Sequence, residues 1–398
     1  MNILVLNCGS SSVKYQLFNM DNESVLAKGM VERIGIEGAS LIHYPEGQEK
    51  VVIEKEIPDH NAAVQLCLEA LINPTYGVIE NYNEINAIGH RIVHGGQISN
   101  SSLIDQKIKD MIRDLIKLAP LHNGPGLRGI EACEAILPGV PQVAVFDTSF
   151  HQTMPDYAYI YSLPYELYEN HNIRRYGFHG TSHKYVALRA AALVEKPLEE
   201  LKLITCHLGN GSSIAAIKYG KVQDTSMGFT PLAGLTMGTR CGDIDPAIVT
   251  YLQNQGYTSE EIDRLMNKQS GVLGVSGVSS DFRDVESAML EGNDRARLAW
   301  DIFVYTVKKF IGSYIAVLNG LDILVFTAGL GENFISARQA ICKDMDYVGI
   351  EIDENENKVR GCEKEITAAG SKARVFVIPT NEELMIARDT KNIVSNVG

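Results

Sequence analysis

The stretch ILVLNCGSSSVKYQLF (residues 3–18) has a counterpart in the second half of the chain, LITCHLGNGSSIAAI (residues 203–217). Each copy joins two apolar runs of β character through a tight turn of Gly, Asn and Ser. Such a turn directs backbone N–H groups and short hydroxyls toward one point, an arrangement that binds anions such as phosphate. A hairpin that occurs twice predicts two related halves that close on a nucleotide.

The size and charge of the chain narrow the protein class. A chain of 398 residues exceeds one ordinary core, so two domains are expected. The net charge of −13 and the pI near 5.3 argue against a nucleic-acid or anionic-membrane partner. The seven Cys include no C-x-x-C pair, which fits a reducing compartment and disfavours zinc. The first residues do not form a signal peptide and no apolar run has membrane-spanning length, so we expect a cytoplasmic protein.

The pattern along the chain predicts α/β architecture in both halves. Helices are predicted over 61–71, 125–136, 295–319 and 381–390, and buried strands over 85–89, 143–146 and 323–327. Thr258 to Glu261 reads as a capping box, and Gly271 as the stop of the helix that it opens. Asp245 and Pro246 read as the N-cap and N1 of an earlier helix, and Thr380 begins the cap of the last helix. The predicted domains are 1–150, which the C-terminal helix 382–398 joins, and 151–381.

Three clusters of polar and glycine residues are candidates for chemistry, and there is no P-loop and no protein-kinase signature. In GHRIVHGG (89–96), Arg91 offers a planar fork for a carboxylate or phosphate, or else a structural salt bridge. In RRYGFHGTSH (174–183), His179 between glycines is a catalytic or phosphate-binding candidate rather than a core histidine, and His183 is expected to begin the next helix. In the long loop 228–246, Arg240 could act as an arginine finger, the alternative being an ordinary Ω-loop.

Other stretches carry weaker signals. FTAGLGEN (326–333) is a glycine-rich turn from a strand to a helix that suits a nucleotide. Asp281 and Asp147 lie at the ends of elements, where either could be a solvated cap. Glu382 and Glu383 lie at a helix N-terminus, where carboxylates are favourable for electrostatic reasons alone.

Taken together, these segments resemble the acetate kinase family, part of the superfamily of acetate and sugar kinases, heat-shock chaperones and actin. The carrying motifs span nearly the whole chain: NCGSSSVK (7–14), HRIVHGG (90–96), FDTSFHQTMP (146–155), RYGFHGTSH (175–183), HLGNGSS (207–213), TPLAGLTMGTRCGDIDPA (230–247), FTAGLGEN (326–333) and TNEELMIARDT (380–390). Ala233 departs from the family pattern, in which an acidic residue is common, and no assigned role depends on it.

The resemblance implies two duplicated actin-like (ribonuclease H-like) domains, each a mixed β-sheet flanked by helices, with an active-site cleft between them. It implies reversible, direct in-line transfer of the γ-phosphoryl of ATP to acetate, giving acetyl phosphate and ADP. Mg²⁺ would be the cofactor, with Mn²⁺ as a substitute, and the enzyme would be a homodimer.

The resemblance also implies roles for residues. Asp147, His179 and Arg240 would be catalytic, with Asp147 orienting an arginine and acetate rather than removing a proton, and Asn7 and Glu382 would hold Mg²⁺. Acetate would bind at Arg91, its methyl group in a pocket of Val93, Leu121, Phe178 and Pro231. The nucleotide would contact Lys14, His207, Leu208, Gly209, Asn210, Gly211, Asp281, Phe282, Arg283, Gly329, Leu330, Gly331, Glu332 and Asn333.

Three alternatives remain. A propionate or other short-chain acyl kinase is the nearest, because a hydrophobic pocket discriminates one methylene by only about 1–3 kcal/mol. A nucleotide-gated binding protein of the chaperone or filament type would need a further peptide-binding domain, for which the motifs leave no room. A sugar kinase would need a carboxylate that activates a neutral hydroxyl, whereas two arginines suit an anionic acceptor.

Overall fold

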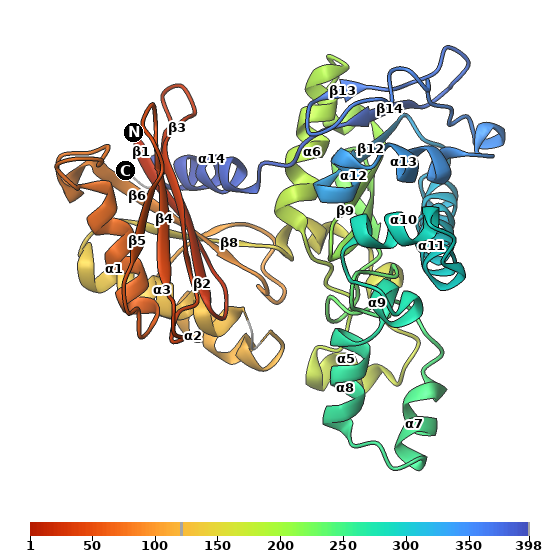
Figure 1. The fold of residues 1–398 in the computed structure, drawn as a ribbon, viewed down its shortest axis with the longest axis horizontal. Coiled ribbons are helices and arrows are strands. Elements are labelled where there is room, and N and C mark those ends of the chain that lie inside the picture. The colour runs from red at the N-terminus through yellow and green to blue at the C-terminus, as the bar shows by residue number, and fades with distance from the viewer. Residues whose placement is uncertain (120–121, 397–398) are drawn as a thin grey trace. The chain divides into compact units, whose positions relative to one another are not determined.

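The computed structural model describes residues 1–119 and 122–396. The chain forms two compact units, Met1–Phe150 with Asn381–Gly398, and His151–Thr380. Each unit is built on one β-sheet, and most of the strands and helices are labelled in Figure 1.

The first unit contains an eight-stranded sheet in the order β5-β4-β3-β2-β1-β6-β8-β7. Strands β1 (Asn2–Cys8), β2 (Ser12–Asn19), β3 (Ser24–Glu32), β4 (Ser40–Pro45) and β5 (Val51–Glu54) form an antiparallel meander. Strands β6 (Ile85–Ile92) and β8 (Gln142–Phe146) run parallel to β1, and β7 (Ser102–Leu103) closes the edge. The parallel strands therefore end at the same edge of the sheet as the turn of the first hairpin.

Helices cover both faces of this sheet. Alternate residues of β1 and β6, such as Leu4, Leu6 and Ile88, form a core with α1 (His60–Leu71) and α3 (Asn123–Ile136). On the other face Gly89 lies under α14 (Glu382–Ser395), where a Cβ would come within 2.6 Å of Ile386 Cγ2. A glycine on β6 thus allows the C-terminal helix to pack directly on the strand. The remaining helices of this unit are α2 (Gln106–Asp114) and the 3₁₀ turns η1 (Tyr82–Glu84) and η2 (Leu115–Lys117).

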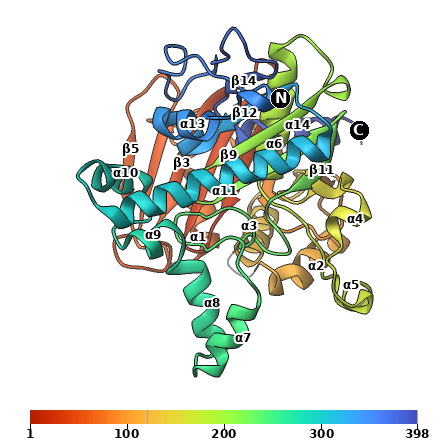
Figure 2. The same cartoon turned by 90° about the vertical axis from the view of Figure 1, so that its right-hand side faces the viewer.

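The second unit has a six-stranded sheet in the order β11-β10-β9-β12-β14-β13. The strands are β9 (Lys202–Leu208), β10 (Ser212–Lys218), β11 (Lys221–Thr225), β12 (Ile323–Thr327), β13 (Lys364–Glu365) and β14 (Arg374–Val377). One face packs on the long helix α11 (Asp294–Leu318) through Trp300, Phe303, Val307 and Ile311. The other carries α6 (Gly180–Leu193), which bonds to β9. In Figure 2 α11 crosses the view in front of its sheet.

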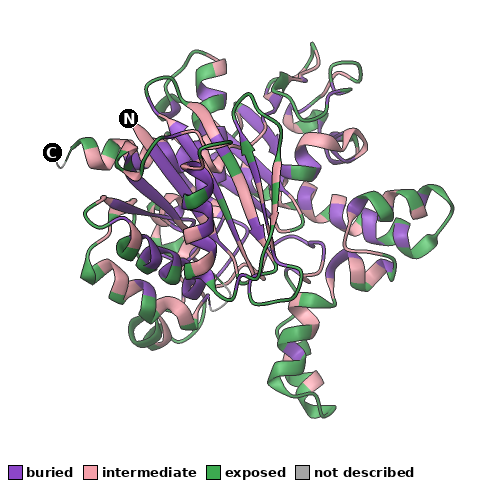
Figure 3. Ribbon diagram, turned by 60° about the vertical axis from the view of Figure 1, so that its left-hand side comes forward, coloured by how far each residue is buried: buried purple, intermediate pink, exposed green. Residues whose placement is uncertain are grey.

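The two sheets share one plan. In both sheets, three antiparallel strands (β3-β2-β1 or β11-β10-β9) are followed by two strands (β6-β8 or β12-β14) that run parallel to β1 or β9. The repeated hairpins are β1–β2 and β9–β10, as predicted. The duplicated α/β fold is therefore confirmed. Burial is most continuous in the central strands, such as β8, β9 and β12, whereas outer strands such as β5 and β13 have no buried residue; Figure 3 shows this contrast in purple against pink and green.

The rest of the second unit consists of shorter helices: η3 (Ser149–Thr153), α4 (Asp156–Tyr159), α5 (Tyr165–His171), η4 (Leu198–Glu200), α7 (Ala247–Asn254), α8 (Ser259–Lys268), α9 (Gly271–Ser276), α10 (Phe282–Leu290), α12 (Ala328–Asn333), α13 (Ile335–Cys342) and η5 (Asp346–Val348), of which η3 begins in the first unit. Helices α7 and α8 extend away from the sheet of this unit (Figure 2). Among the described residues, no helix is both long and apolar enough to cross a membrane.

Most predicted elements are confirmed, and the corrections concern helix ends. Gly271 does not end α8, which stops at Lys268; it begins α9 with φ +63°, where a Cβ would lie 2.1 Å from Met237 O. The N-cap of α7 is Pro246 rather than Asp245. The N-cap of α14 is Asn381, which accepts from Leu384 N, because the Thr380 hydroxyl is bonded elsewhere. His183 lies inside the first turn of α6 rather than at its start.

Candidate active site

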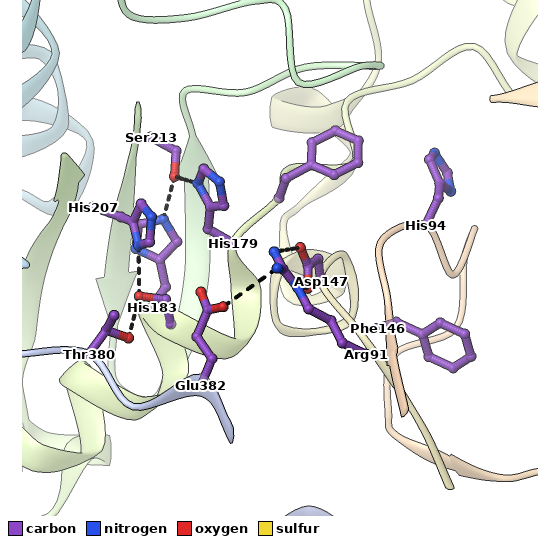
Figure 4. Close-up of polar contacts among 12 residues, drawn as sticks. Arg91, His94, Phe146, Asp147, His179, His183, His207, Ser213, Thr380 and Glu382 are labelled. Carbon is purple, nitrogen blue, oxygen red and sulfur yellow. Dashed lines mark hydrogen bonds and ion pairs between the residues drawn. The ribbon is translucent and has the colours of Figure 1, made fainter. Parts of the chain in front are cut away.

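In the first unit, an arginine and an aspartate meet at the carboxyl ends of two adjacent parallel strands. Arg91 lies near the end of β6, and Asp147 directly follows β8. Arg91 Nε donates to Asp147 Oδ1 at 3.0 Å and Nη2 donates to Oδ2 at 2.7 Å (Figure 4). The Asp147 side chain is only 2% exposed. This two-bond fork fixes the orientation of the guanidinium.

The same guanidinium faces a second carboxylate. Arg91 Nη1 lies 3.8 Å from Oε2 of Glu382, the first residue of α14. Burial works to lower the pKa of Arg91, but Asp147 and Glu382 outweigh it and raise the pKa. Burial raises the pKa of Glu382 to about 7; Arg91 and Lys14 lower it, whereas Asp147 and Glu383 raise it further. The cluster thus brings three carboxylates together with two cations.

The first hairpin presents the residues predicted to contact metal and phosphate. Asn7 on β1 is paired with Lys14 on β2, one on each side of the hairpin turn. A hydrogen bond from Gly9 N to Ser12 O, at 2.8 Å, closes this turn. Lys14 acts electrostatically on Glu382, which relates the hairpin to the start of α14. Val93, predicted for the methyl pocket, follows β6 and is half-buried, and Leu121 lies outside the described residues.

Further residues that sequence reasoning did not assign hold the turn after Arg91. Asn123 accepts from His94 N at 3.1 Å and donates to His94 O at 2.9 Å. Thr148 Oγ1 accepts from Gly95 N at 3.1 Å. Burial lowers the pKa of His94 to about 4, so this imidazole is neutral at physiological pH. Thr148 directly follows Asp147, and that adjacency was the only signal for it.

In the second unit, His179 is the N-cap of α6 with φ +56°, a left-handed conformation that is costly for a non-glycine residue. The preceding turn is tight, since a Cβ on Gly177 would lie 2.4 Å from Thr225 Cγ2. The His179 ring stacks on His207 of β9 with centroids 4.1 Å apart. Phe178, predicted for the methyl pocket, is only 2% exposed, and its carbonyl accepts from His151 Nε2 at 2.9 Å.

Buried hydroxyl groups link the histidines of this unit (Figure 4). Ser213 Oγ lies 2.9 Å from His179 Nδ1 and 2.8 Å from His183 Nε2. His207 Nδ1 bonds to Ser182 Oγ, which also bonds to Thr380 Oγ1, each at 2.8 Å. Sequence reasoning missed both serines, because each partner lies on a different element.

Arg240 is a half-buried cation whose charge is not compensated within the described residues. Its Nη1 donates to Pro231 O at 2.6 Å, and no carboxylate there forms an ion pair with it. Burial lowers the pKa of Arg240. The guanidinium lies over the turn of the second hairpin, since a Cβ on Gly211 would lie 2.7 Å from its Nη2. A cation in this setting favours an anionic ligand.

A pocket of about 500 Å³ lies beside that turn, within the second unit. It is lined by Gly209, Asn210, Ser280, Asp281, Phe282, Arg283, Gly329, Leu330, Asn333 and Phe334. Eight of these were predicted to contact a nucleotide, and Ser280 and Phe334 were not. The pocket volume lies in the usual range for small-ligand sites. Asn210 is held closely, since a Cβ on Gly238 would lie 1.6 Å from its Oδ1.

The other predicted nucleotide residues do not line this pocket. The Leu208 side chain belongs to the core under α11, and Gly331 packs against the backbone of Phe326. Glu332 Oε1 accepts from Ala328 N at 2.7 Å and from Thr380 N at 3.1 Å. Its carboxylate thereby supports Ala328, which has φ +63°.

Comparison with known proteins gives consistent matches over the whole chain. Residues 2–388 match the model of the acetokinase family. The chain is 73% identical over 395 residues to the acetate kinase of Moorella thermoacetica, covering 99% of this chain and 100% of that protein. A crystal structure of Porphyromonas gingivalis acetate kinase superposes with a TM-score of 0.95 at 50% identity, covering 99% of both chains. A propionate kinase from Francisella tularensis superposes with a TM-score of 0.91 at 45% identity, covering 98% of this chain and 99% of that one.

Proposed function

The chain belongs to the acetokinase family, and from this premise we propose how its own residues transfer a phosphoryl group between ATP and acetate. The activity is that of a carboxylate phosphotransferase, which forms acetyl phosphate and ADP. Its assignment to residues, set out below, is supported by the chemistry of each group.

Arg91 is the proposed acetate ligand. Its two bonds to Asp147 use Nε–H and one Nη2–H, which leaves three N–H donors of the guanidinium for a second carboxylate. Asp147 would thus orient Arg91 and would not act as a base, because the acetate substrate is already ionised at neutral pH. Val93, Leu121, Phe178 and Pro231 are the proposed contacts of the methyl group.

Arg240 and His179 are the proposed ligands of the transferring phosphoryl group. In-line transfer requires positioning and neutralisation of charge on the phosphoryl oxygens more than covalent chemistry. The uncompensated charge of Arg240 is the single observation that best supports this proposal, since a phosphoryl group would supply the missing anion. We further propose that the pocket of about 500 Å³ binds the nucleoside of ATP. The turn after β9 and the Lys14 side chain would contact its phosphates.

The cluster around Glu382 fits Mg²⁺. Carboxylate and amide oxygens from Glu382 and Asn7 are hard ligands, and Mg²⁺ is usually held by one or two such groups together with water and phosphate oxygens. The raised pKa of Glu382 is further support: burial is its main cause, with Asp147 and Glu383 adding to it, and a bound cation would stabilise this buried carboxylate in its charged form. When bound, Mg²⁺ would neutralise phosphate charge.

The decisive experiment measures kcat/KM with ATP and Mg²⁺ against acetate, propionate and butyrate, trapping acyl phosphate as hydroxamate. We expect the maximum at acetate. The likeness to a propionate kinase makes propionate the second candidate, and a maximum there would reassign the substrate. If no acyl phosphate formed, the proposal would fail in favour of a nucleotide-gated binding protein.

Two coarser properties complete the proposal. We propose a homodimer located in the cytoplasm. Sedimentation velocity at micromolar concentration should give a species of twice the 43.7 kDa chain mass, and a monomer would contradict the first. Cell fractionation tests the second.

A further inference from the structure

A chain of three hydrogen bonds leads from His179 into the interior of the second unit. Ser213 Oγ, on β10, lies 2.9 Å from His179 Nδ1 and 2.8 Å from His183 Nε2. His183 Nδ1 lies 2.7 Å from Thr205 Oγ1, on β9. Ser213, His183 and Thr205 are fully buried. Buried polar groups that are joined in this way fix one another's orientation.

His183 is a neutral link of this chain. Burial lowers its pKa well below the usual value, and the facing rings of His151 and His207 lower it further. His151 meets its ring edge-on with centroids 5.6 Å apart, and the centroid of His207 lies 6.2 Å away. A neutral imidazole donates from one nitrogen and accepts at the other.

With His183 neutral, the protons can therefore be placed in three ways. When His179 is neutral, His183 Nε2–H donates to Ser213, Ser213 O–H donates to His179 Nδ1, and the proton of His179 lies on Nε2. When His179 takes a proton from solvent, its Nδ1–H donates to Ser213, Ser213 donates to His183 Nε2, and His183 carries its proton on Nδ1, toward Thr205. In the third, His179 is neutral with its proton on Nδ1, and the bonds run as in the second. Nε2 of His179 is thus protonated in the first two arrangements and bare in the third. While His179 is neutral the first arrangement is favoured, because there the buried Thr205 hydroxyl donates to His183 Nδ1, and among the described residues Thr205 Oγ1 has no other hydrogen bond.

We propose that Ser213 and His183 are positioning residues that keep a proton on Nε2 of His179, so that this atom donates to the transferring phosphoryl group in either charge state of the ring. The inference rests on the proposed role of His179. Phosphoryl oxygens only accept hydrogen bonds, so a neutral ring with its proton on Nδ1 would present a lone pair to an anion. The two ring nitrogens are distinct, and the partner of one decides what the other can do.

The test is the pH dependence of kcat in Ser213→Ala, measured at saturating substrates from about pH 5.5 to about pH 9, a range that spans ordinary imidazole titration. At the acid end the imidazolium carries both protons, so kcat should remain close to that of the parent. At the alkaline end kcat should fall on the order of 10- to 100-fold, the usual effect of losing the group that orients a functional histidine. The ratio of variant to parent cancels the titration of ATP and acetate.

Ser226→Ala is the matched control. Ser226 is also buried, and its Oγ accepts from the backbone N–H of Ile214, the residue after Ser213, at 2.9 Å. Among the described bonds, Ser226 Oγ has none to a histidine. Its variant should show a pH-independent ratio. A pH-independent ratio for Ser213→Ala as well would overturn the proposal.

Two further measurements keep the outcomes distinct. ¹⁵N NMR of the histidine rings in the parent protein, assigned through His179→Asn, should show a neutral His179 protonated on Nε2; protonation on Nδ1 would overturn the proposal without any serine variant. Asn is chosen because it tolerates a positive φ. If His179→Asn keeps a near-normal kcat, the assignment of His179 in the proposed function fails, whatever Ser213 does.

Discussion

Replacing Arg240 with Met should separate activity from stability. Met keeps the apolar stem of the side chain and removes only the guanidinium. If Arg240 serves the transferring phosphoryl group, its loss should lower kcat on the order of 10³-fold, the lower end for an arginine finger. That loss equals about 4 kcal/mol of transition-state stabilisation. KM for acetate should change little, because the interaction strengthens in the transition state.

The stability of the free enzyme should hardly change. The substitution removes one bond, from Nη1 to Pro231 O, worth about 1 kcal/mol. It also removes a half-buried charge that desolvation disfavours, as the lowered pKa of Arg240 indicates. The two effects oppose each other, so the free energy of unfolding should stay within about 1 kcal/mol of the parent, or about 2–4 °C in Tm.

Arg338→Met is the matched control for stability. Arg338 is fully buried and donates to the carbonyl groups of Gly331, Asn357 and Val359 and to Asn357 Oδ1. Its loss should cost more than about 3 kcal/mol, because several buried acceptors lose their donor at once. Thermal unfolding and steady-state kinetics on both variants test the reasoning. A kcat within tenfold of the parent in Arg240→Met, or a stability loss as large as in the control, would refute it.

Three other predictions follow from single contacts. Arg91→Ala should raise KM for acetate by about 10- to 100-fold, the value of charge-assisted bonds to a carboxylate, and an unchanged KM would move that site elsewhere. Burial raises the pKa of the Cys241 thiol, so its thiolate is scarce at neutral pH. Mass spectrometry after iodoacetamide treatment should find the exposed Cys362 alkylated first, with Cys241 reacting faster only at alkaline pH; early labelling of Cys241 would contradict this. Gly238→Ala should raise KM for ATP, because the added Cβ would displace the Asn210 amide that lines the pocket. The control is Gly312→Ala in α11, where the added Cβ meets nothing within 4 Å; it should leave the kinetics unchanged and stabilise the protein by about 0.5–1 kcal/mol. Equal KM values for the two variants would count against the pocket as the ATP site.

The sequence predicted the parts of the fold that depend on local physical chemistry. Apolar runs interrupted by Gly, Asn and Ser identified both hairpins, and the capping box at Thr258 identified the start of α8. Gly271 shows the limit of local reasoning. A glycine after a helix is a good stop signal, but this one is required by the carbonyl of Met237, which lies far from it in sequence.

The candidate site divides in the same way. Arg91, His179 and Arg240 stood out because charged or titratable side chains between glycines are unusual. Ser213 and Ser182 did not, since a serine gives no sign of its partner until the strand and helix are brought together. The sequence pointed to Thr380 as the cap of α14, whereas the structure has Asn381. Both residue types cap helices, and only the bond between Thr380 and Ser182 decides between them.

The groups proposed for catalysis share a physical property: each is held in a state that costs stability in the free protein. Arg240 has no counter-charge in the described part of the chain, Glu382 is buried beside other carboxylates, and His179 has a positive φ. Such features persist only where the surrounding structure enforces them. An anion beside Arg240 and a cation beside Glu382 would each remove one of these costs. On the proposed assignment, ATP and Mg²⁺ would therefore supply the charges that the folded chain lacks, and binding energy would be directed to the atoms between which the phosphoryl group moves.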